Sequence, residues 1–491
     1  MTWREYHQFT KHTAEALRRS QHFLDWDTMP DPFRHYVGAP VLDLPADPAS
    51  PLIPALDLLQ GASGRTQTSN GPAFLSQLLF YSAAISAAKS VPSTGYRYAL
   101  RVNPSSGNLH PTEFHFLTSG IQNWPDGLYH YRPSSHMAEQ RAVGFIDLKL
   151  AGQTAPIVFV LTSIAWREAW KYRDRAYRYC LHDIGHAWQS VVLAARALGC
   201  ETFTTCDFHD EDIARFCRLS EDEWPMLLIE IRGAVPIRKP DASSVVWQGG
   251  IPNRLSTYQV PYRQINAIHE ATKIGSHELA KTESQQEACG EGSIQLPSPA
   301  SSIRPFGEVA RTRRSALNFR GGSESISLAQ LSSLLAAASQ PLIGDTFAAC
   351  FVQLYLYIHR VEGLEPGVYR FWPEHLQLER VRIGDQRLAS SGLSLGQDLA
   401  GNACVAFSMI ADIELAVRSY GDRGYRYVHF EAGAIGQRLY IAAEAVGVRA
   451  TGIGAFFDDE VHKYLGISPE QGQVIYHFAI GYPVHDARLD A

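Results

Sequence analysis

The chain has 491 residues, of which 45% are hydrophobic and 19% are charged, and its formal net charge at pH 7 is -6. This composition excludes a disordered chain, and the lack of a Lys/Arg-rich stripe argues against a nucleic-acid partner. The length exceeds what one hydrophobic core usually organises, so we expect at least two domains.

Other global features argue against a secreted or membrane protein. The first residues, MTWREYHQFT, carry charges and contain no apolar stretch of the kind found in a secretory signal. No segment approaches the ~18 uncharged apolar residues of a membrane span. The seven cysteines form no CxxC pair, so we expect neither a disulfide framework nor a zinc site. We therefore predict a cytoplasmic protein with no membrane partner.

The first half of the chain predicts, in order, a helix, several short strands, a long helix and a closing strand. The helical pattern is LSQLLFYSAA, the strands include TEFHFLT and GLYHY, and the closing strand is MLLIEIRGA. The second half repeats this order with LSSLLAAASQ, GVYRF and VIYHFAIGY. Such an order is typical of an α+β sandwich with helices on the faces of a sheet.

The two halves are related by a fixed offset. Residues 171–199 read KYRDRAYRYCLHDIGHAWQSVVLAARALG, and residues 419–447 read SYGDRGYRYVHFEAGAIGQRLYIAAEAVG. The offset of 248 residues that aligns them continues to Gly233 and Gly481. A period of this size indicates a tandem domain duplication rather than a solenoid.

The composition between the copies predicts a linker, because KTESQQEACGEGSIQLPSPASS is rich in Ser, Gln, Pro and Glu. We expect an N-terminal extension at 1–54, a first domain at 55–235, a linker at 236–304 and a second domain at 305–491. Two copies joined in this way can pack as a pseudo-symmetric dimer within one chain.

Three short stretches carry residue types suited to ligand binding. PSSGN at 104–108 is a turn whose N–H groups and hydroxyls can bond a planar polar ligand. RTRRS at 311–315 can clamp a phosphate with two arginines. TGIGAF at 451–456 contains glycines that let the backbone approach a ligand ring. Taken singly, each is also explained as an ordinary turn or a solvated basic patch.

Two further sets of residues are chemically suggestive. Lys171 and Tyr172 could exchange protons with a substrate, and the second copy has Ser419 in place of the lysine. His182 and His186 have the i, i+4 spacing of metal ligands on a helix. No third ligand accompanies the histidines in the sequence, so we predict no metal site.

Together these segments resemble the flavin-dependent nitroreductase superfamily, and most closely its SagB/ThcOx-type branch, the azoline dehydrogenases of thiazole/oxazole-modified peptide pathways. The first copy shows RVNPSSGNLHP, GLYHY and KYRDRAYRY. The second shows RRS, GVYRF, SYGDRGYRY and TGIGAF. The resemblance implies two nitroreductase-like α/β sandwich domains that form an intramolecular pseudo-dimer.

The resemblance also implies FMN at the interface, with contributions from both subunits of the usual dimer. Here these contributions are complementary, because the first copy lacks the Arg-Arg-Ser segment and the glycine turn, whereas the second lacks the Pro-Ser-Ser-Gly segment. One composite FMN site is therefore expected. Its implied cofactor-binding residues are Pro104, Ser105, Ser106, Gly107 and Asn108 from the first copy, and Arg313, Arg314, Ser315, Gly452 and Gly454 from the second. Its implied catalytic residues are Lys171 and Tyr172.

The activity implied by the resemblance is dehydrogenation of a heterocycle or peptide-like substrate, with hydride transfer to flavin N5 and proton removal by Tyr172 or Lys171. Expected partners are this small-molecule or peptide substrate and other biosynthetic enzymes, and the chain is either monomeric or further dimerised. Two alternatives stay open. One is an NAD(P)H-dependent reductase of nitro or quinone compounds, and the other is a flavin-free scaffold protein of a biosynthetic pathway.

Overall fold

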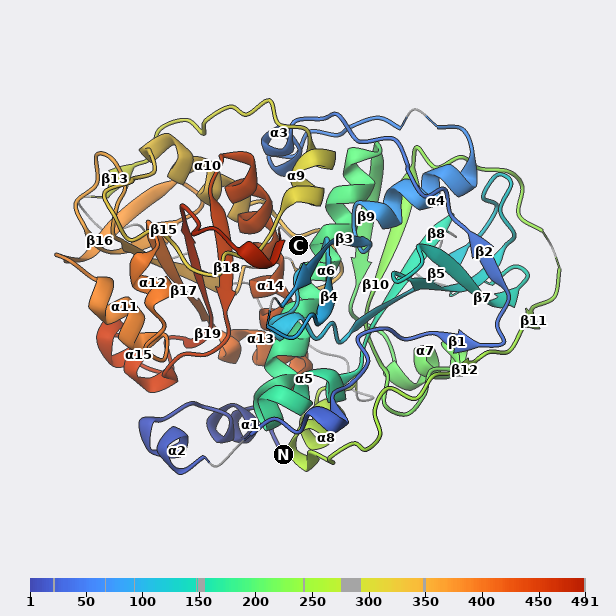
Figure 1. The fold of residues 1–491 in the computed structure, drawn as a ribbon, viewed down its shortest axis with the longest axis horizontal. Coiled ribbons are helices and arrows are strands. Elements are labelled where there is room, and N and C mark those ends of the chain that lie inside the picture. Colours follow the sequence, from blue (N-terminus) through green and yellow to red (C-terminus); the bar gives the residue numbers. More distant parts are fainter. Residues whose placement is uncertain are drawn as a thin grey trace.

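The computed structural model describes the chain except for residues 21–22, 67, 92, 147, 149–154, 242, 275–292, 348–349 and 490–491. Two α+β domains lie side by side, and two long helices run between their sheets (Figure 1). One continuous core includes buried side chains from both sheets and both long helices, so the two domains share their interior. Within the described residues, the structure contains no helix with the length and hydropathy of a membrane span.

The two sheets have the same topology. In the first domain the strand order is β7-β6-β5-β8-β10-β9, and in the second it is β16-β15-β14-β17-β19-β18, with antiparallel pairing throughout. The first set is β5 (Thr112–Thr118), β6 (Gly127–Arg132), β7 (Met137–Val143), β8 (Ile157–Ser163), β9 (Cys200–Thr205) and β10 (Trp224–Gly233). The second set is β14 (Val352–Ile358), β15 (Gly367–Trp372), β16 (Gln377–Ile383), β17 (Val405–Ala411), β18 (Arg449–Ile453) and β19 (Gln473–Gly481). The tandem duplication is confirmed.

The offset between the copies changes in the closing strands. Leu161 of β8 pairs with Leu227, whereas Met409 of β17 pairs with Tyr476. The first residues of these pairs differ by 409 − 161 = 248, and the second residues by 476 − 227 = 249. The alignment of Gly233 with Gly481 is therefore wrong by one residue, because the second copy has one more residue before its closing strand.

The long helices α6 (Ala176–Ala197) and α14 (Gly424–Ala445) cross in backbone contact. A Cβ on Gly185 would stand 2.2 Å from the carbonyl oxygen of Phe430, and one on Gly433 would stand 2.1 Å from that of His182. Any larger residue at either glycine would push the helices apart. Because Gly185 and Gly433 are equivalent positions, the crossing lies on the pseudo-twofold axis.

Shorter helices either pack beside the two long helices in the common core or cover the opposite faces of the sheets. In the first domain they are α3 (Ala55–Leu59), α4 (Gly71–Phe80), α5 (Ala165–Tyr172) and α7 (Asp210–Cys217). In the second they are α9 (Phe306–Thr312), α10 (Leu328–Ala338), α11 (Arg387–Leu393), α12 (Asp398–Asn402), α13 (Ile413–Tyr420) and α15 (Asp458–Leu465). Single turns η3 (Arg173–Arg175) and η4 (Gly421–Arg423) connect α5 to α6 and α13 to α14.

The N-terminal extension contacts both domains. It contains α1 (Trp3–Phe9), α2 (Ala14–Arg19), η1 (Trp26–Thr28), β1 (Tyr36–Val37) and β2 (Val41–Asp43). Tyr6 packs edge-on against Tyr177 of α6 and Tyr425 of α14, at ring distances of 6.0 and 6.1 Å. The extension therefore helps to hold the two long helices together.

The predicted linker contains ordered elements as well. Outside residues 242 and 275–292, which are not described, it forms β11 (Val246–Trp247), β12 (Ile251–Pro252), α8 (Arg263–Ala271) and β13 (Ile294–Gln295). His269 of α8 stacks on Trp224 at 3.9 Å, and Ile265 and Ile268 are buried in the common core. This segment therefore packs against the domains in addition to connecting them, which the polar composition did not indicate.

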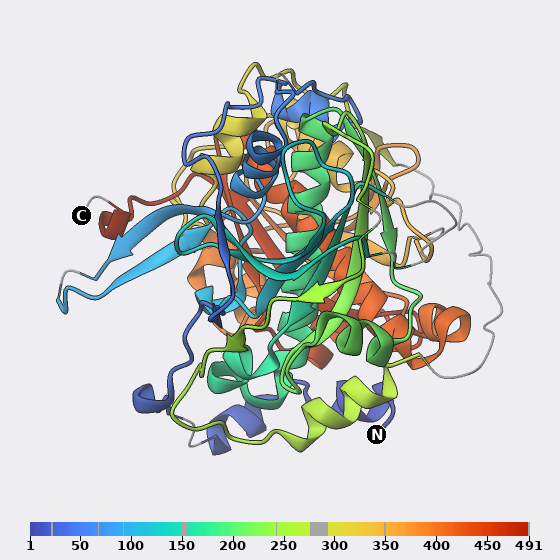
Figure 2. The same cartoon turned by 90° about the vertical axis from the view of Figure 1, so that its right-hand side faces the viewer.

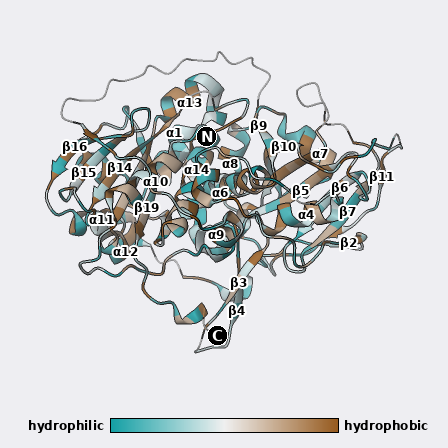
Figure 3. Cartoon of the chain, turned by 90° about the horizontal axis from the view of Figure 1, so that it is seen from above, coloured by the Kyte–Doolittle hydropathy of each residue, from teal (hydrophilic) through white to brown (hydrophobic). Residues whose placement is uncertain are grey.

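A hairpin of β3 (Ile85–Ser90) and β4 (Arg97–Arg101) projects from the molecule beside the C-terminal segment (Figures 2 and 3). The C-terminal segment ends in η5 (Ala487–Leu489). Lys89 Nζ of the hairpin lies 2.7 Å from Asp486 Oδ2, and Arg488 Nε lies 2.7 Å from Asp486 Oδ1. Asp486 thus ties the hairpin of the first domain to the tail of the second.

Candidate functional site

A cavity of about 630 Å³ lies between the two domains, and it is lined by residues from both. Its walls include all ten residues that the sequence predicted for cofactor binding, five from each copy, together with Tyr172. Lys171 lies directly behind this wall, since its Nζ is 3.2 Å from the position that a Cβ on Gly107 would take. Segments separated by more than 300 residues in the sequence therefore form one site.

The two arginines of the site are held by the backbone of the first domain. Arg313 Nε donates to the carbonyl of Val102 at 3.0 Å, and its Nη2 donates to that of Arg101 at 3.1 Å. Arg314 Nη2 donates to the carbonyl of Ser86 at 2.9 Å. Arg313 Nη1 is buried and has no hydrogen-bond partner among the described residues.

No carboxylate among the described residues lies within ion-pair distance of Arg313 or Arg314, and Glu444 acts on them only at longer range. Burial, followed by the charge of the adjacent Arg313, lowers the pKa of Arg314 to about 10. Burial also lowers the pKa of Arg313. An anion placed beside them would regain part of this electrostatic cost and would satisfy the unpaired N–H group.

The Ser-Ser-Gly turn forms η2 (Ser106–Asn108), in which Gly107 has a φ of 59°. Asp183 of α6 fixes this turn by accepting from Ser105 Oγ at 2.6 Å and from the backbone N–H of Ser106 at 3.1 Å. A Cβ on Gly107 would stand 2.6 Å from the hydroxyl of Tyr172. The glycine is therefore required both by its backbone conformation and by the close approach of the tyrosine.

Gly452 and Gly454 lie at the end of the edge strand β18, where Gly452 pairs with Phe478 and Gly454 follows the strand, so the first half of the expected glycine turn is strand. Ser315 is joined to β18 by a parallel bridge at Ala450. Tyr440 of α14 connects the two segments, because its hydroxyl lies 2.9 Å from Ser315 Oγ and accepts from the N–H of Gly452 at 2.9 Å. A Cβ on Gly452 would stand 2.0 Å from the hydroxyl of Tyr476. The backbone here lines the cavity without side chains in the way.

Tyr172 is the last residue of α5, where Arg173 with a φ of 53° ends the helix and turns the chain into α6. The Tyr172 ring meets Tyr179 edge-on at 4.7 Å, and Lys171 Nζ lies 5.3 Å from its centroid. Burial, followed by the nearby Glu168, raises the pKa of Tyr172 well above its ordinary value, so the side chain is a neutral phenol at neutral pH.

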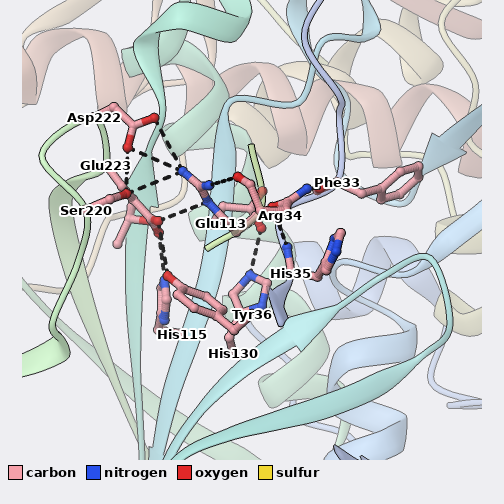
Figure 4. Close-up of polar contacts among 12 residues, drawn as sticks. Phe33, Arg34, His35, Tyr36, Glu113, His115, His130, Ser220, Asp222 and Glu223 are labelled. Atoms are coloured by element: carbon pink, nitrogen blue, oxygen red, sulfur yellow. Dashed lines mark hydrogen bonds and ion pairs between the residues drawn. The ribbon is translucent and has the colours of Figure 1, made fainter. Parts of the chain in front are cut away.

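Helix α5 is supported from behind by a buried network of charged residues that the N-terminal extension completes (Figure 4). Arg34 inserts beside Glu223, with Nε 3.5 Å from Oε2, and His130 lies 2.9 Å from Glu113 and 2.8 Å from Glu139. Burial alone would lower the pKa of His130, but the two glutamates raise it, so the ring carries a proton. Arg167 of α5 pairs with Glu113.

The second copy keeps an acid, Glu379, at the position of Glu139, but its described residues do not reproduce the rest of this network. Strand pairing places Gln353, Tyr355 and Arg370 at the positions of Glu113, His115 and His130. The buried charges are therefore not a requirement of the sheet, and they accompany the half that carries Lys171 and Tyr172.

The symmetry-related position in the other interface is closed. Thr204, which corresponds to Gly452, donates its N–H to the carbonyl of Ile343 at 3.2 Å. Asp345 accepts from the N–H groups of Cys206 and Asp207, both at 3.0 Å. The loop that replaces the Ser-Ser-Gly turn thus pairs with the backbone that would face a ligand.

Large side chains also pack beside this closed loop. Trp188 is fully buried and lies 4.8 Å from the ring of Phe347. Its equivalent in the other copy is Gly436, where even a Cβ would stand 2.7 Å from His186. The two interfaces have therefore diverged into an open and a closed form.

The sequence profile of the nitroreductase family matches residues 82–233 and 310–482, which together are more than half of the chain. The chain belongs to the nitroreductase family. Each matched range falls within one of the two α+β domains, so both copies are nitroreductase domains and the predicted resemblance at this level is confirmed.

Known proteins similar to the chain include the MJ1384 protein of Methanocaldococcus jannaschii, named as a nitroreductase, which is 32% identical over 157 residues, or 30% of this chain and 77% of that protein. The microcin B17-processing protein McbC of Escherichia coli is 28% identical over 150 residues, or 28% of this chain and 54% of McbC. The trifolitoxin-processing protein TfxB of Rhizobium leguminosarum bv. trifolii is 29% identical over 143 residues, or 26% of this chain and 38% of TfxB. The chain thus spans about half of McbC and less than half of TfxB.

A crystal structure from Anabaena variabilis, described as that of a nitroreductase, superimposes on the chain with a TM-score of 0.78 at 26% identity. The likeness covers 98% of this chain and 99% of the other. It therefore extends over both nitroreductase domains and the segments around them.

Several cavity residues of this nitroreductase-family protein were not predicted from the sequence. Asp183, His186 and Tyr476 lie on its floor, and Lys89 and Arg488 reach it from the hairpin and the tail. His186 Nε2 lies 3.1 Å from the hydroxyl of Tyr476, and neither of these residues recurs in the other copy. A comparison of the two copies could have found this pair, whereas the hairpin and the tail are too far apart in the sequence to suggest a joint role.

Proposed function

We propose that this nitroreductase-family oxidoreductase is an FMN-dependent dehydrogenase with one composite site, formed by the first domain (55–235) and the second domain (305–491). The observation that carries the proposal is the asymmetry of the two interfaces. One has an open cavity lined by every predicted cofactor residue, and in the other the equivalent backbone pairs with a loop.

The residues present fit FMN. The cationic pair Arg313 and Arg314 with Ser315 would hold the phosphate, and the unpaired Arg313 Nη1 supplies a free donor for it. Ser105, Ser106, Gly107 and Asn108, which follow Pro104, would bond the edge of the flavin ring. Gly452 and Gly454 would allow the ring to approach the backbone, because side chains there would collide with Tyr476 and Tyr179.

When bound, FMN supplies a ring that accepts a hydride at N5. The protein's part is to orient the substrate and to remove a proton. Tyr172 lines the cavity as a neutral phenol and can hold the substrate by a hydrogen bond, and Lys171 adds a second group for proton exchange beside it.

The direction of the reaction is proposed from the SagB/ThcOx-type resemblance and from the similarity to McbC and TfxB, which are named for processing microcin B17 and trifolitoxin. We propose oxidation of a heterocycle or peptide-like C–N unit in natural-product biosynthesis, with other enzymes of such a route as partners. The Lys171–Tyr172 pair fits this reaction, because oxidation requires loss of a substrate proton as well as a hydride.

Anaerobic spectroscopy of the FMN-loaded protein tests the proposal. We expect an oxazoline- or thiazoline-containing peptide to bleach the flavin absorbance, and NADPH to do so much more slowly. Rapid bleaching by NADPH alone would instead identify a nitro or quinone reductase. A protein that stays colourless after addition of FMN would be a flavin-free scaffold.

A further inference from the structure

Glu168 is a buried acid next to the cavity wall, and none of the roles predicted from the sequence includes it. It lies on α5 one helical turn before Lys171 and Tyr172, and its side chain is fully buried. Ser105 Oγ lies 3.5 Å from Glu168 Oε1, at the limit of a hydrogen bond. Oε2 receives no hydrogen bond from the described residues. A carboxylate in this position would be poorly solvated.

Glu168 forms a carboxyl pair with Asp183 of α6. Ser105 Oγ contacts both acids, at 2.6 Å from Asp183 Oδ2 and 3.5 Å from Glu168 Oε1, so the two buried carboxyls lie side by side. Two neighbouring buried carboxyls are both ionised only at a high electrostatic cost, which favours a proton on one of them. Asp183 already accepts from Ser105 Oγ and from both the N–H and the hydroxyl of Ser106. Because these donors favour the ionised form of Asp183, the proton belongs on Glu168.

The electrostatics agree with this assignment. Burial, and then the charge of Asp183, raise the pKa of Glu168 well above its ordinary value. Burial also raises the pKa of Asp183 to about 7, against the hydrogen bonds from Ser105 and Ser106. The other titratable groups that face Glu168 are Cys180 on α6 and Lys171 and Tyr172 on its own helix.

The closed interface shows that the fold does not need this acid. Helix α13 has Ala416 at the position of Glu168, and that alanine is fully buried. An acid is kept at the position of Asp183, where Glu431 accepts from the N–H groups of Phe351 and Val352 at 3.0 and 3.1 Å. Lys171 is replaced by Ser419. The copy with a closed site has therefore lost Glu168 and Lys171 together while keeping the acid that anchors its loop.

We propose that Glu168 is a positioning residue of the composite site: it holds a proton at neutral pH and, through Asp183 and Ser105, fixes the Ser-Ser-Gly turn that faces the cofactor. Its relevance to FMN rests on the proposed function. Its protonation and its contact with Asp183 do not, so the two can be tested separately.

The first test compares Glu168→Gln with wild type without FMN, by thermal unfolding between pH 5 and 9. The pKa of Glu168 is higher in the folded state than in the unfolded state, where it is ~4.3. Wild type therefore loses stability as the pH rises from the unfolded-state pKa toward the folded-state pKa. Glutamine is not subject to this loss. The melting temperature of the variant should therefore exceed that of wild type by an amount that grows with pH. An infrared difference spectrum should show the C=O band of a protonated carboxyl in wild type and not in the variant.

Glu113→Gln is the matched control, because Glu113 is an equally buried acid with the opposite shift. Burial raises its pKa, but Arg167 lowers it to about 2. The ionised Glu113 stabilises the fold above pH ~4.3, and this stabilisation is lost as the pH falls toward the folded-state pKa. The variant should therefore be less stable than wild type, and the difference between them should shrink at low pH. If Glu168→Gln behaves like this control, the proposal is overturned.

The second test measures FMN affinity by fluorescence titration. Glu168→Ala introduces the residue found at the equivalent position, Ala416, in the second copy. This variant should bind FMN about tenfold more weakly, because Ser105 of the turn loses its contact with the acid. Glu168→Gln should bind within about threefold of wild type, and the weakening of wild-type binding between pH 7 and 9 should be smaller in this variant. Equal affinity of the alanine variant and wild type would contradict the positioning role. A wild type that binds no FMN would reject the proposed function, and the stability and infrared results would still decide the protonation of Glu168.

Discussion

The chain contains two versions of the same domain interface, one open and one closed, and they differ in a limited set of residues. Features found in both are the crossing at Gly185 and Gly433 and the ion pairs of Arg178 with Asp458 and of Arg426 with Asp210, at 2.8 and 2.6 Å. Because they occur whether or not a cavity is present, we interpret them as requirements of the fold.

The features found in the open interface alone have a different character. They are Lys171 beside the cavity, the glycines of residues 451–456, the adjacent Arg313 and Arg314 in the cavity wall, and the buried acid Glu168 beside the Ser-Ser-Gly turn. Each is costly or neutral for stability, since burial disfavours charges and glycines loosen the backbone. The closed interface therefore serves as an internal control for the open interface.

The largest expected effect comes from replacing Lys171 by serine, the residue found at the equivalent position, Ser419, in the second copy. Lys171→Ser should lower the rate of flavin reduction by an azoline-containing peptide about a thousandfold, within the range for loss of a general acid or base. FMN content should not change. Stopped-flow absorbance measures this rate, with Ser419→Ala as the control in the closed copy. A comparable loss in the control would contradict the assignment.

Copying the closed backbone should have the next largest effect. Gly452→Thr reproduces Thr204, and its Cβ would collide with Tyr476, which costs affinity through strain and through loss of space. We expect FMN binding to weaken about a hundredfold. The reverse change, Thr204→Gly, should leave the FMN affinity measured by titration as it is in wild type. Weaker binding in Thr204→Gly would mean that both interfaces take part.

A smaller loss is expected at the cationic end of the cavity. Arg313→Ala removes a charged donor and should weaken FMN binding about thirtyfold. Riboflavin, which has no phosphate, should bind both proteins equally. Arg65, an exposed residue in the corresponding segment of the first copy, gives the control variant Arg65→Ala. If riboflavin binding falls as much as FMN binding, the arginine does not act on the phosphate.

The last expected effect, which is on stability alone, concerns the shared ion pairs, and it should be the same on both sides. Burial raises the pKa of Asp458, but Arg175 and Arg178 lower it to about 2. The ionised Asp458 should stabilise the fold by about 2 kcal/mol above pH ~3.9, the pKa of an unfolded aspartate, and this stabilisation should be lost as the pH falls below it. Asp458→Asn and Asp210→Asn should each lower the free energy of unfolding, measured in urea at pH 6, by a similar amount. A large difference between the two variants would show that the ion pairs of Asp458 and Asp210 are not purely structural.

Much of this organisation could be predicted from the sequence. The repeated KYRDRAYRY and SYGDRGYRY segments predicted the duplication, because both long helices keep the arginines, Arg178 and Arg426, that form the equivalent ion pairs. PSSGN, RTRRS and TGIGAF all lie on one cavity, as expected from their complementary occurrence in the two copies.

The remainder depends on contacts that leave no local pattern. Lys89 and Asp486 meet only because the hairpin and the tail project from different domains to the same place. Helix α8 has an apolar face within a segment whose average composition is polar, so composition concealed it. The pairing of Glu168 with Asp183 arises where α5 and α6 pack together, and only a residue-by-residue comparison of the copies indicates it.

The central claim is that one chain holds one cofactor. Release of FMN by denaturation of the saturated, desalted protein, quantified per mole of chain, tests it most directly. The account predicts a value near one, which Ser106→Trp should reduce to near zero by filling the cavity. A value near two would show that the interface closed by Asp345 also binds flavin, and a value near zero for the wild type would contradict the proposed function.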